Sequence, residues 1–348
     1  MKTAIDHLRQ RGNRGTRAGL IFFIRTPLTV ALIFAILHGC AYMPPDSTVE
    51  PGFRPASTVA SPMASAQQKN NAPSIQARSA IMVDAQSGRT LYEKNADERL
   101  PIASTQKLLT AMEVIAEGGL EQEIQVTIWD QLQPPTKLGL IAGTSHRRLD
   151  LLGAMLVSSA NDAASTLANA AEGSYGDFIS RMNARAERLG AKHSLFLNPH
   201  GLDMPGQHST ARDAAIIAYH AYRVPLIRHF AAQEIIPFSY GDGRTVLLEN
   251  TNILLWNRPS YFNGLKSGFT IEGGKCLVAS AKHDGREILI VLLSSTQEEV
   301  FRDAKRLFRW YEKQVKTNAA GDAPPARADA ARGRCDAAEQ PVQVVWSL

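Results

Sequence analysis

The stretch PIASTQKLLTAMEVIAEGG, residues 101–119, predicts a helix with a polar first turn and an otherwise apolar body. Ser104 and Lys107 lie three positions apart, so this helix would place both side chains on one face. Gly118 and Gly119 follow the apolar run and suit a helix C-cap. Lys107 belongs either to an ordinary polar face or to a site in which it takes the proton of the Ser104 hydroxyl.

The second reading needs a lysine with an unusual pKa. A serine hydroxyl is a weak nucleophile and requires an adjacent base. An amine with a pKa of about 10.4 is charged at neutral pH and cannot serve, unless an apolar wall or a second cation lowers that pKa. Ile102–Ala103 and Leu108–Leu109 would supply such a wall. The S-x-x-K pattern is weak by itself, because chance matches occur in a chain of 348 residues.

Two further segments strengthen the site hypothesis. Ser159–Asn161 (SAN) falls at a predicted helix break, where side chains can project into a cleft. Lys266–Gly268 (KSG) lies in a predicted strand, and Gly268 would let a substrate backbone approach the sheet edge closely. That edge could bind an extended peptide as an added strand. Lys266 would supply the second cation, and Ser267 a hydroxyl for a carboxylate.

The surrounding pattern predicts one compact unit over residues 75–316. Turn residues 86–88 separate two strand-like runs, and turn residues 283–285 separate two more. Helical patterns fill the middle, including an amphipathic run ended by Gly190. Strands at both ends with helices between them predict a mixed α/β (α+β) fold. We expect an antiparallel sheet whose terminal segments pair, flanked by helices, with an inserted helical lobe.

The first 39 residues predict an export signal. They hold six basic residues against Asp6 alone, which accounts for the whole net charge of +5 and removes the hint of a nucleic-acid partner. The apolar run 28–37 is too short to span a bilayer, as expected of a signal peptide. LHGC, ending at Cys40, resembles a bacterial lipobox, with His38 as a departure. Cys40 is then lipidated, or cleavage occurs near Ala41.

Residues 40–74 and 317–348 are rich in small and polar residues and predict a disordered tether and a disordered tail. Cys335 lies in that tail, whereas Cys276 lies in a strand-like run. We therefore expect no structural disulfide. A buried strand thiol is also a poor candidate for a nucleophile.

The three motifs together carry a family resemblance. S-x-x-K at Ser104–Lys107, S-x-N at Ser159–Asn161 and K-[ST]-G at Lys266–Gly268 resemble, in this order, the penicillin-recognising serine enzymes. The segments IASTQKLLTA, MLVSSANDAASTLA, FLNPHGLD, HSTARDAA and NGLKSGFT are similar to the serine D-Ala-D-Ala carboxypeptidases, the low-molecular-mass penicillin-binding proteins. The resemblance covers residues 75–316 and implies a β-lactamase/D,D-peptidase-like fold.

The resemblance also implies roles. Ser104 would be the acylated nucleophile and Lys107 its general base, with two backbone N–H groups, of Ser104 and of Phe269 or Thr270, as the oxyanion hole. The remaining roles are a proton relay for Ser159, a hydrogen bond to the substrate amide and to Lys107 for Asn161, a positive field for Lys266, and carboxylate binding for Ser267.

Several positions leave alternatives open. Arg212 would strengthen the carboxylate site or form an ion pair with Asp213 or Asp203. His200, Asp203 and His208 could suggest a metal site, but their segments are better explained as framework loops, so we expect no metal and no cofactor. Asp162 is expected to cap the following helix. Phe269 and Lys275 occupy variable positions, which leaves substrate preference undecided.

The predicted function is a periplasmic D,D-peptidase that acts on peptidoglycan stem peptides and is inhibited covalently by β-lactams. Removal of a terminal D-Ala and cleavage of D-Ala cross-links would use the same residues, so carboxypeptidase and endopeptidase both remain. A β-lactamase would need a glutamate-bearing E-x-x-L-N loop, which does not follow SAN. The intact motif residues argue against an inactive wall-binding lipoprotein. A lipid on Cys40 or an uncleaved signal would anchor the protein to the membrane.

Overall fold

The computed structural model describes residues 72–256 and 261–321. The predicted signal peptide, Cys40, nearly all of the predicted tether, Cys335 and residues 322–348 lie outside the described residues. No helix in the described ranges is long and apolar enough to cross a membrane.

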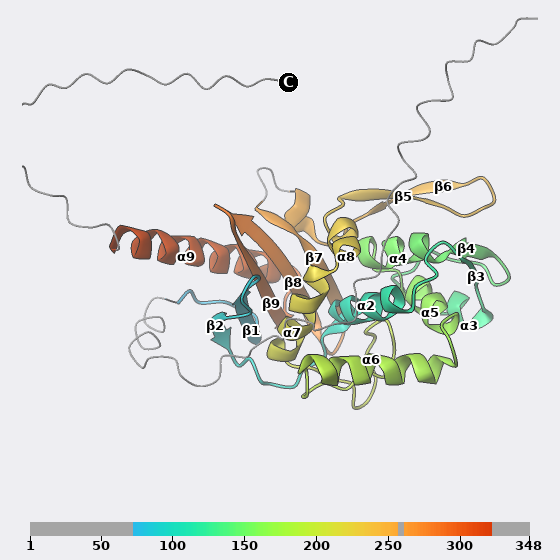
Figure 1. The fold of residues 1–348 in the computed structure, drawn as a ribbon, viewed down its shortest axis with the longest axis horizontal. Helices are drawn as coiled ribbons and strands as arrows, with labels where there is room; N and C mark the ends of the chain where they lie inside the picture. Colours follow the sequence, from blue (N-terminus) through green and yellow to red (C-terminus); the bar gives the residue numbers. More distant parts are fainter. Residues whose placement is uncertain (1–71, 257–260, 322–348) are drawn as a thin grey trace, which may run out of the picture. The chain divides into compact units, whose positions relative to one another are not determined.

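A five-stranded antiparallel sheet organises the described chain, in the order β2-β1-β9-β8-β7 (Figure 1). Among the described residues, the first strand, β1, pairs with the last, β9, with Ser79 opposite Leu293. The prediction that the terminal segments pair is therefore confirmed. β7 forms one edge of the sheet. The strands are β1 (Ser79–Asp84), β2 (Thr90–Lys94), β7 (Phe262–Thr270), β8 (Gly274–His283) and β9 (Arg286–Ser295).

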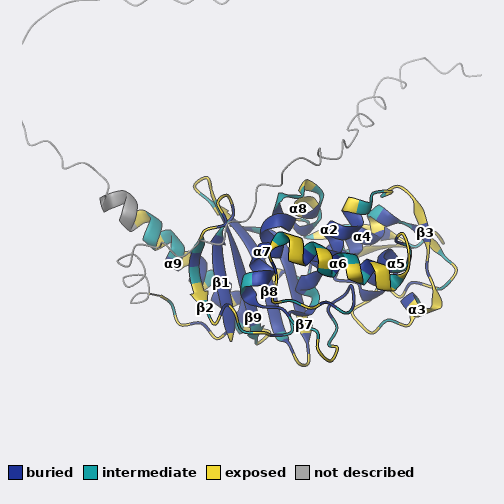
Figure 2. Ribbon diagram, turned by 60° about the horizontal axis from the view of Figure 1, so that its bottom comes forward, coloured by how far each residue is buried: buried dark blue, intermediate teal, exposed yellow. Residues whose placement is uncertain are grey.

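The two faces of the sheet are covered by different parts of the chain. Side chains alternate along a strand, so Ile81 and Val83 of β1 pack with the helical lobe, whereas Ala80 and Met82 pack with α9 (Glu299–Gly321). β1, β7, β8 and β9 are accordingly largely buried between the two layers, whereas β2 is mostly not (Figure 2). α9 runs past the predicted domain end at 316, so the first described residues of the predicted tail are helical.

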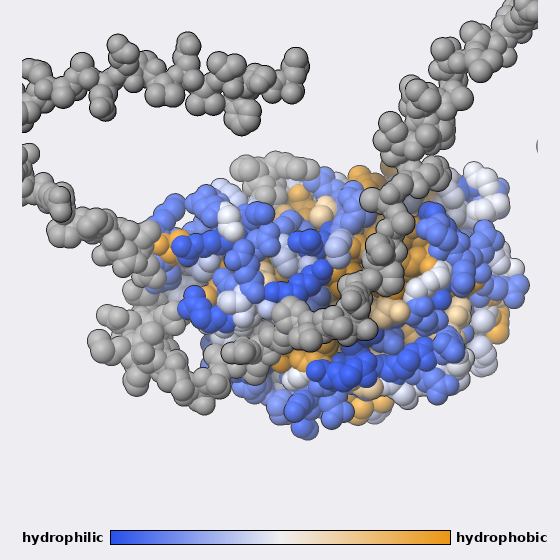
Figure 3. All heavy atoms as spheres, viewed as in Figure 1, coloured by the Kyte–Doolittle hydropathy of each residue, from blue (hydrophilic) through white to orange (hydrophobic). Residues whose placement is uncertain are grey.

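The inserted lobe lies between β2 and β7 in the sequence. Gly118 ends α2 and Gly190 ends α6, as predicted. α6 buries one stripe of side chains and turns a hydrophilic side outward (Figure 3). The elements of the lobe are η1 (Ala103–Gln106), α2 (Lys107–Glu117), β3 (Glu123–Gln125), α3 (Ile128–Gln131), β4 (Ser145–Arg147), α4 (Arg148–Val157), α5 (Asn161–Asn169), α6 (Tyr175–Leu189), α7 (Ala211–Arg223), α8 (Pro225–Ala231), β5 (Ile235–Ser239), β6 (Thr245–Glu249) and η2 (Ile253–Trp256).

Two local expectations were wrong. The residues around Ser104 form a short 3-10 helix, and the α-helix begins only at Lys107. Asp162 is not the N-cap residue of α5, a position that Ala160 holds, although its Oδ1 accepts the N–H of Ala163 in the first turn at 2.9 Å. Its carboxylate also accepts the N–H groups of residues 138–140, and so fixes a loop that the sequence pattern did not connect with this helix.

Candidate active site

The backbone at Ser104 is held between two glycines from distant parts of the chain. A Cβ built on Gly268 of β7 would lie 2.5 Å from the Ser104 nitrogen, and one built on Gly201 would lie 2.1 Å from the carbonyl oxygen of Ala103. Gly201 also has φ +86°, which disfavours other residues. From the sequence, Gly268 was expected to let a substrate backbone approach the strand. In the structure, the atom nearest to its Cβ position is the backbone nitrogen of Ser104.

The amine of Lys107 contacts three oxygen atoms. Its Nζ lies 2.9 Å from Ser104 Oγ, 2.7 Å from Asn161 Oδ1 and 2.6 Å from the His200 carbonyl oxygen. The side chain is fully buried. A spacing of three residues brings Lys107 under Ser104, while Asn161 and His200 reach it from α5 and from the loop before α7.

These three contacts suit a neutral amine. A charged lysine has three donors and no acceptor, so loss of one proton leaves two N–H groups and a lone pair. The oxygens of Asn161 and His200 can only accept, which directs the lone pair at the Ser104 hydroxyl. Burial, followed by the positive charge of Lys266, lowers the pKa of Lys107 well below its ordinary value, and the charge of Asp162 acts in the opposite direction.

Asn161 is positioned by the loop of residues 134–140. Its side-chain N–H donates to the Pro134 carbonyl at 3.0 Å, and its backbone N–H donates to the Thr136 carbonyl at 2.8 Å. The carboxylate of Asp162, the next residue, accepts N–H bonds from residues 138–140 at 2.8–3.1 Å. Two adjacent side chains at the start of α5 thus fix the same loop, and Asn161 keeps its carbonyl oxygen for Lys107.

Ser159 lies between α4 and α5 in a left-handed backbone conformation, with φ 66°. It is 7% exposed, and its hydroxyl has no hydrogen-bond partner among the described residues. The structure places it two residues before Asn161 without a direct hydrogen bond to Ser104 or Lys107. A non-glycine residue held in this conformation stores strain, as is common near active sites.

Lys266 and Ser267 meet at Thr251, which the sequence reasoning did not identify. Lys266 Nζ donates to the Ser267 carbonyl at 2.9 Å and to Thr251 Oγ1 at 3.4 Å. Ser267 Oγ lies 3.0 Å from both the carbonyl oxygen and Oγ1 of Thr251. Burial and the charge of Lys275 lower the pKa of Lys266 to about 7.

The role of the His200 backbone carbonyl was not predicted from the sequence, which suggested His200 only as a possible metal ligand. The loop before it is ordered by Asn198, whose Oδ1 accepts the N–H of Gly201 at 2.7 Å. This arrangement aims the His200 carbonyl at Lys107. Burial and the charge of Lys107 lower the pKa of the His200 imidazole to about 3, so the ring is neutral. The segment NPHGLD was noticed, but a backbone carbonyl leaves no signal in the residue type.

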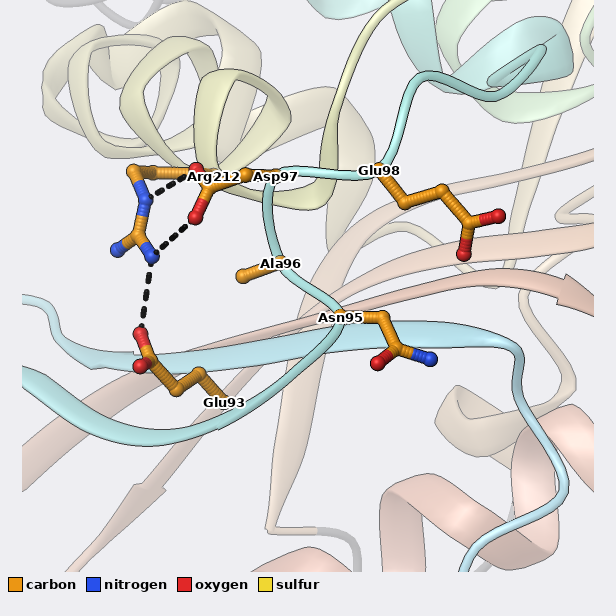
Figure 4. Close-up of a pocket in the computed structure, with 6 residues that line it drawn as sticks. All are labelled: Glu93, Asn95, Ala96, Asp97, Glu98 and Arg212. Atoms are coloured by element: carbon orange, nitrogen blue, oxygen red, sulfur yellow. Dashed lines mark hydrogen bonds and ion pairs between the residues drawn. The ribbon is translucent and has the colours of Figure 1, made fainter.

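Arg212 is held by two acidic side chains near β2. Its guanidinium contacts Asp97 at 2.7 and 2.9 Å and Glu93 at 3.0 Å (Figure 4). The expected pairing with Asp213 or Asp203 is therefore wrong, and these two ion pairs engage the guanidinium that was offered for the carboxylate site. The surrounding surface depression is lined by Glu93, Asn95, Ala96, Asp97, Glu98 and Arg212.

The other candidate groups face local partners. Asp203 accepts the N–H of Glu272, and His208 Nδ1 lies 2.7 Å from the Gly206 carbonyl oxygen. Within residues 72–256 and 261–321, no three His, Cys, Asp or Glu side chains are placed to hold a metal ion. Cys276 is buried, which raises its thiol pKa to about 12 and leaves it a poor nucleophile.

Sequence comparison connects this site with known proteins. A model of the D-alanyl-D-alanine carboxypeptidase family matches residues 66–297. D-alanyl-D-alanine carboxypeptidase DacC of Escherichia coli is 34% identical over 259 residues, which cover 70% of this chain and 63% of that protein. A D-alanyl-D-alanine endopeptidase of Pseudomonas aeruginosa is 32% identical, over 67% of this chain and 76% of that protein. The match thus covers less than two thirds of the length of DacC but more than two thirds of the length of the endopeptidase.

Solved structures share the fold. A D-alanyl-D-alanine carboxypeptidase from Mycobacterium tuberculosis has a TM-score of 0.66 and 30% identity, over 75% of this chain and 96% of that chain. Penicillin-binding protein D2 of Listeria monocytogenes, solved in its ampicillin-bound form, has a TM-score of 0.58 and 28% identity, over 68% of this chain and 98% of that chain. The predicted β-lactamase/D,D-peptidase-like fold is confirmed.

Proposed function

The chain belongs to the D-alanyl-D-alanine carboxypeptidase family, and from this premise we propose that it is a serine D,D-peptidase that removes the terminal D-Ala of peptidoglycan stem peptides. One observation carries the proposal: the buried amine of Lys107, directed at Ser104 Oγ from 2.9 Å. An uncharged amine beside a serine hydroxyl is the activated pair that acyl transfer requires.

Acylation would begin as Lys107 takes the Ser104 proton and Oγ attacks the carbonyl of the penultimate D-Ala. The resulting oxyanion would face the N–H groups of Ser104 and of Phe269 or Thr270. Ser159 would relay the proton to the leaving amine, and Asn161 would hold the substrate amide. Lys266 and Ser267 would bind the charged end of the peptide. Water would then release the acyl group.

β-Lactams are proposed to acylate Ser104 by the same route. The likeness to an ampicillin-bound penicillin-binding protein supports this proposal. Rapid hydrolysis of benzylpenicillin by the protein would instead indicate a β-lactamase. A long-lived covalent adduct, detected by mass spectrometry, is the expected outcome.

The first test compares Ser104→Ala with the unchanged protein on a pentapeptide that ends in D-Ala-D-Ala. Release of D-Ala and labelling by a fluorescent penicillin should both fall to background. Ser180→Ala is the matched control, because Ser180 is an exposed serine on α6. If D-Ala release persisted in the Ser104 variant, the mechanism would be wrong.

Endopeptidase activity on D-Ala cross-links is the second candidate. The match covers 76% and 78% of D-alanyl-D-alanine endopeptidases from Pseudomonas aeruginosa and Escherichia coli. It covers 63% of DacC and 64% of carboxypeptidase DacF of Bacillus subtilis. Incubation with purified pentapeptide and cross-linked muropeptides, followed by product analysis, separates the two activities. Products from cross-linked dimers alone would assign the endopeptidase, and free D-Ala alone would assign the carboxypeptidase.

We also propose export to the periplasm and anchoring through the N-terminal segment. The basic and apolar pattern of residues 1–39 and the LHGC sequence support this proposal. Cys40→Ser should abolish labelling by a fatty-acid probe in cells. If the unchanged protein is never labelled, ordinary cleavage near Ala41 replaces lipidation.

A further inference from the structure

Tyr240 follows β5 at the turn of the β5–β6 hairpin and reaches the loop of residues 134–140. Its hydroxyl donates to the Leu138 carbonyl oxygen at 2.8 Å, and the two residues are 102 positions apart in the chain. The hairpin that carries Tyr240 was not predicted from the sequence. What this bond controls depends on how the loop itself is held.

The loop is held by hydrogen bonds more than by packing. Residues 134–137 are exposed, and Leu140 is the one residue of the loop that is buried. Segments with few buried apolar contacts open more easily than the core does. The N–H groups of the loop bind the Asp162 carboxylate, and two of its carbonyls bind Asn161. The bond from Tyr240 ties the same loop to a second element, the β5–β6 hairpin.

The Tyr240 ring is itself fixed by two neighbouring side chains. It packs edge-on against the Phe238 ring, with 5.2 Å between the centroids, and Phe238 is buried beside His146 of β4. The Arg244 guanidinium lies 4.4 Å from the centroid of the Tyr240 ring. The Tyr240 N–H also donates to the Arg244 carbonyl oxygen at 3.0 Å. The hydroxyl is thus presented to the loop by a side chain with little freedom to move.

The Tyr240 hydroxyl keeps its proton at neutral pH. Burial raises the pKa of Tyr240 above its ordinary value, and the charge of Asp162 acts in the same direction against that of Arg244. A tyrosine of ordinary pKa is already protonated at pH 7. The hydroxyl is therefore a donor to Leu138 throughout the range in which Lys266 titrates.

The loop in turn decides how the Asn161 amide is oriented. Its N–H group binds the Pro134 carbonyl at 3.0 Å, and its carbonyl oxygen therefore faces Lys107 Nζ at 2.7 Å. If Pro134 moved away, the amide could turn and present its NH2 group to Lys107. That group would compete with the Ser104 hydroxyl for the lone pair of the neutral amine.

We infer that Tyr240 is a positioning residue, which holds the loop of residues 134–140 and through it keeps the Asn161 carbonyl oxygen on Lys107. The inference rests on the proposed function, because its effect on the reaction is measured as acylation of Ser104. It adds to the site a side chain that lies outside the three sequence motifs.

The test uses Tyr240→Phe, which removes the hydroxyl and keeps the ring. We expect the second-order rate constant for acylation by benzylpenicillin to fall about 3- to 10-fold, as for one lost hydrogen bond. Hydrogen exchange at the amides of residues 138–140, followed by mass spectrometry, should become faster because the loop opens more often.

Tyr219→Phe is the matched control. It also removes a hydroxyl that donates to a backbone carbonyl, that of Gln86 at 3.2 Å, in the turn between β1 and β2. This variant should leave the acylation rate and the exchange of residues 138–140 unchanged. Tyr240→Phe should shift the melting temperature no more than this control does, because water can reach the exposed loop and replace the hydroxyl.

A double-mutant cycle shows whether Tyr240 acts through Asn161. In an Asn161→Ala background there is no amide to orient, so Tyr240→Phe should cause no further loss of acylation rate. Equal losses in both backgrounds would overturn the inference, and a lower melting temperature beside them would make Tyr240 a structural residue. Unchanged exchange at residues 138–140 would overturn it as well. If the unchanged protein bound no penicillin, the proposed function would fail, and the exchange rates would still decide whether Tyr240 holds the loop.

Discussion

Lys107 and Lys266 are both buried lysines, and the charge of Lys266 acts on Lys107. Burial lowers the pKa of both, and the charge of Lys266 lowers the pKa of Lys107 further. The pKa of Lys266 is about 7, so Lys266 titrates near neutral pH. A neutral Lys107 beside a charged Lys266 is the combination that acylation requires.

The first prediction concerns Lys266→Met and the pH dependence of acylation. The unchanged protein should acylate faster as pH rises through the pKa of Lys107 and more slowly as pH rises above about 7, where Lys266 loses its charge. Removing that charge raises the pKa of Lys107. The rising limb should move to higher pH and the fall above pH 7 should disappear, measured with a chromogenic β-lactam by stopped flow. A rising limb at its original pH would refute the coupling.

The second prediction concerns Gly268. Its Cβ would lie 2.5 Å from the Ser104 nitrogen, so Gly268→Ala must displace the nucleophile or the strand. We expect a loss of about 1–3 kcal/mol in the free energy of unfolding and a larger relative loss of acylation rate. Gly176→Ala on α6 is the control, because its Cβ meets only an ordinary contact at 3.6 Å. Chemical denaturation and penicillin binding measure the two effects, and an unchanged acylation rate would contradict the argument.

At the residue scale, sequence reasoning predicted the groups that act through their side chains. Ser104, Lys107 and Asn161 do lie together, because motif chemistry is visible in residue type. It could not predict the His200 carbonyl or the contact between Gly268 and Ser104, because backbone atoms are the same in every residue. It also misassigned the partners of Arg212, since Asp97 and Glu93 are more than a hundred positions away along the chain.

The loop of residues 134–140 is the element that depends most on a single side chain. Asp162 is buried and accepts three backbone N–H groups from this loop, while Asn161 holds it at Pro134 and Thr136. The Tyr240 hydroxyl adds a bond to the Leu138 carbonyl at 2.8 Å from the turn between β5 and β6. The loop therefore links α5 to the β5–β6 hairpin.

The third prediction is made for Asp162→Asn. The new side-chain amide would place its own N–H donors against the backbone N–H donors of the loop, so at least one loop N–H would lose its acceptor. The free energy of unfolding should fall by about 1–3 kcal/mol. The charge of Asp162 opposes the pKa lowering of Lys107. Its removal should move the rising limb of acylation to lower pH, opposite to the effect of Lys266→Met. A shift in the same direction for both variants would exclude this electrostatic account.

Elements with strong periodicity were predictable, and short irregular ones were not. The β1–β2 turn, the end of α6 at Gly190 and the long final strands follow from local pattern. The β5–β6 hairpin was missed because its outer residues, such as Leu247 at 69% exposure, are apolar where a strand facing water is expected to be polar. The 3-10 turn at Ser104 packs against Gly201 and Gly268. These glycines are distant in the sequence, so a local sequence pattern cannot predict the turn.

At the scale of the whole molecule, the beginning and end of the described domain are joined. The carboxylate of Asp303 on α9 is buried and accepts the N–H groups of Gln76 and Ala77 at 2.8 and 2.9 Å. Arg306 binds its other oxygen at 2.8 Å. The segment that precedes β1 is thereby attached to the closing helix, next to the pairing of β1 with β9.

The fourth prediction follows from that attachment. Asp303→Ala should lower the free energy of unfolding by about 3–5 kcal/mol, because it leaves buried donors without an acceptor. Acylation measured well below the melting temperature should change little, since α9 lies across the sheet from Ser104. Glu121→Ala removes an ion pair in which the carboxylate is 74% exposed, and should have a much smaller effect on unfolding. Equal losses from the two variants would contradict the assigned role of Asp303.

The fifth prediction concerns acid unfolding. His200 has a folded pKa of about 3 against an ordinary value of 6.5, so the unfolded chain binds the proton first as the pH falls. Stability should decrease by about 1.4 kcal/mol per pH unit between these values. His200→Gln should flatten this dependence in denaturation curves, whereas His229→Gln, on the exposed end of α8, should not. A slope unchanged by His200→Gln would refute the assignment.

The pairing of β1 with β9 has a consequence for how the protein is made. Ser79 in β1 pairs with Leu293 in β9, which is synthesised about 200 residues later. At roughly 5–20 residues per second, a ribosome needs about 10–40 s to supply that partner strand. Until then β1 has no neighbour on that side, and contacts this distant in sequence also form slowly. The five-stranded sheet therefore cannot be completed until most of the chain has been synthesised.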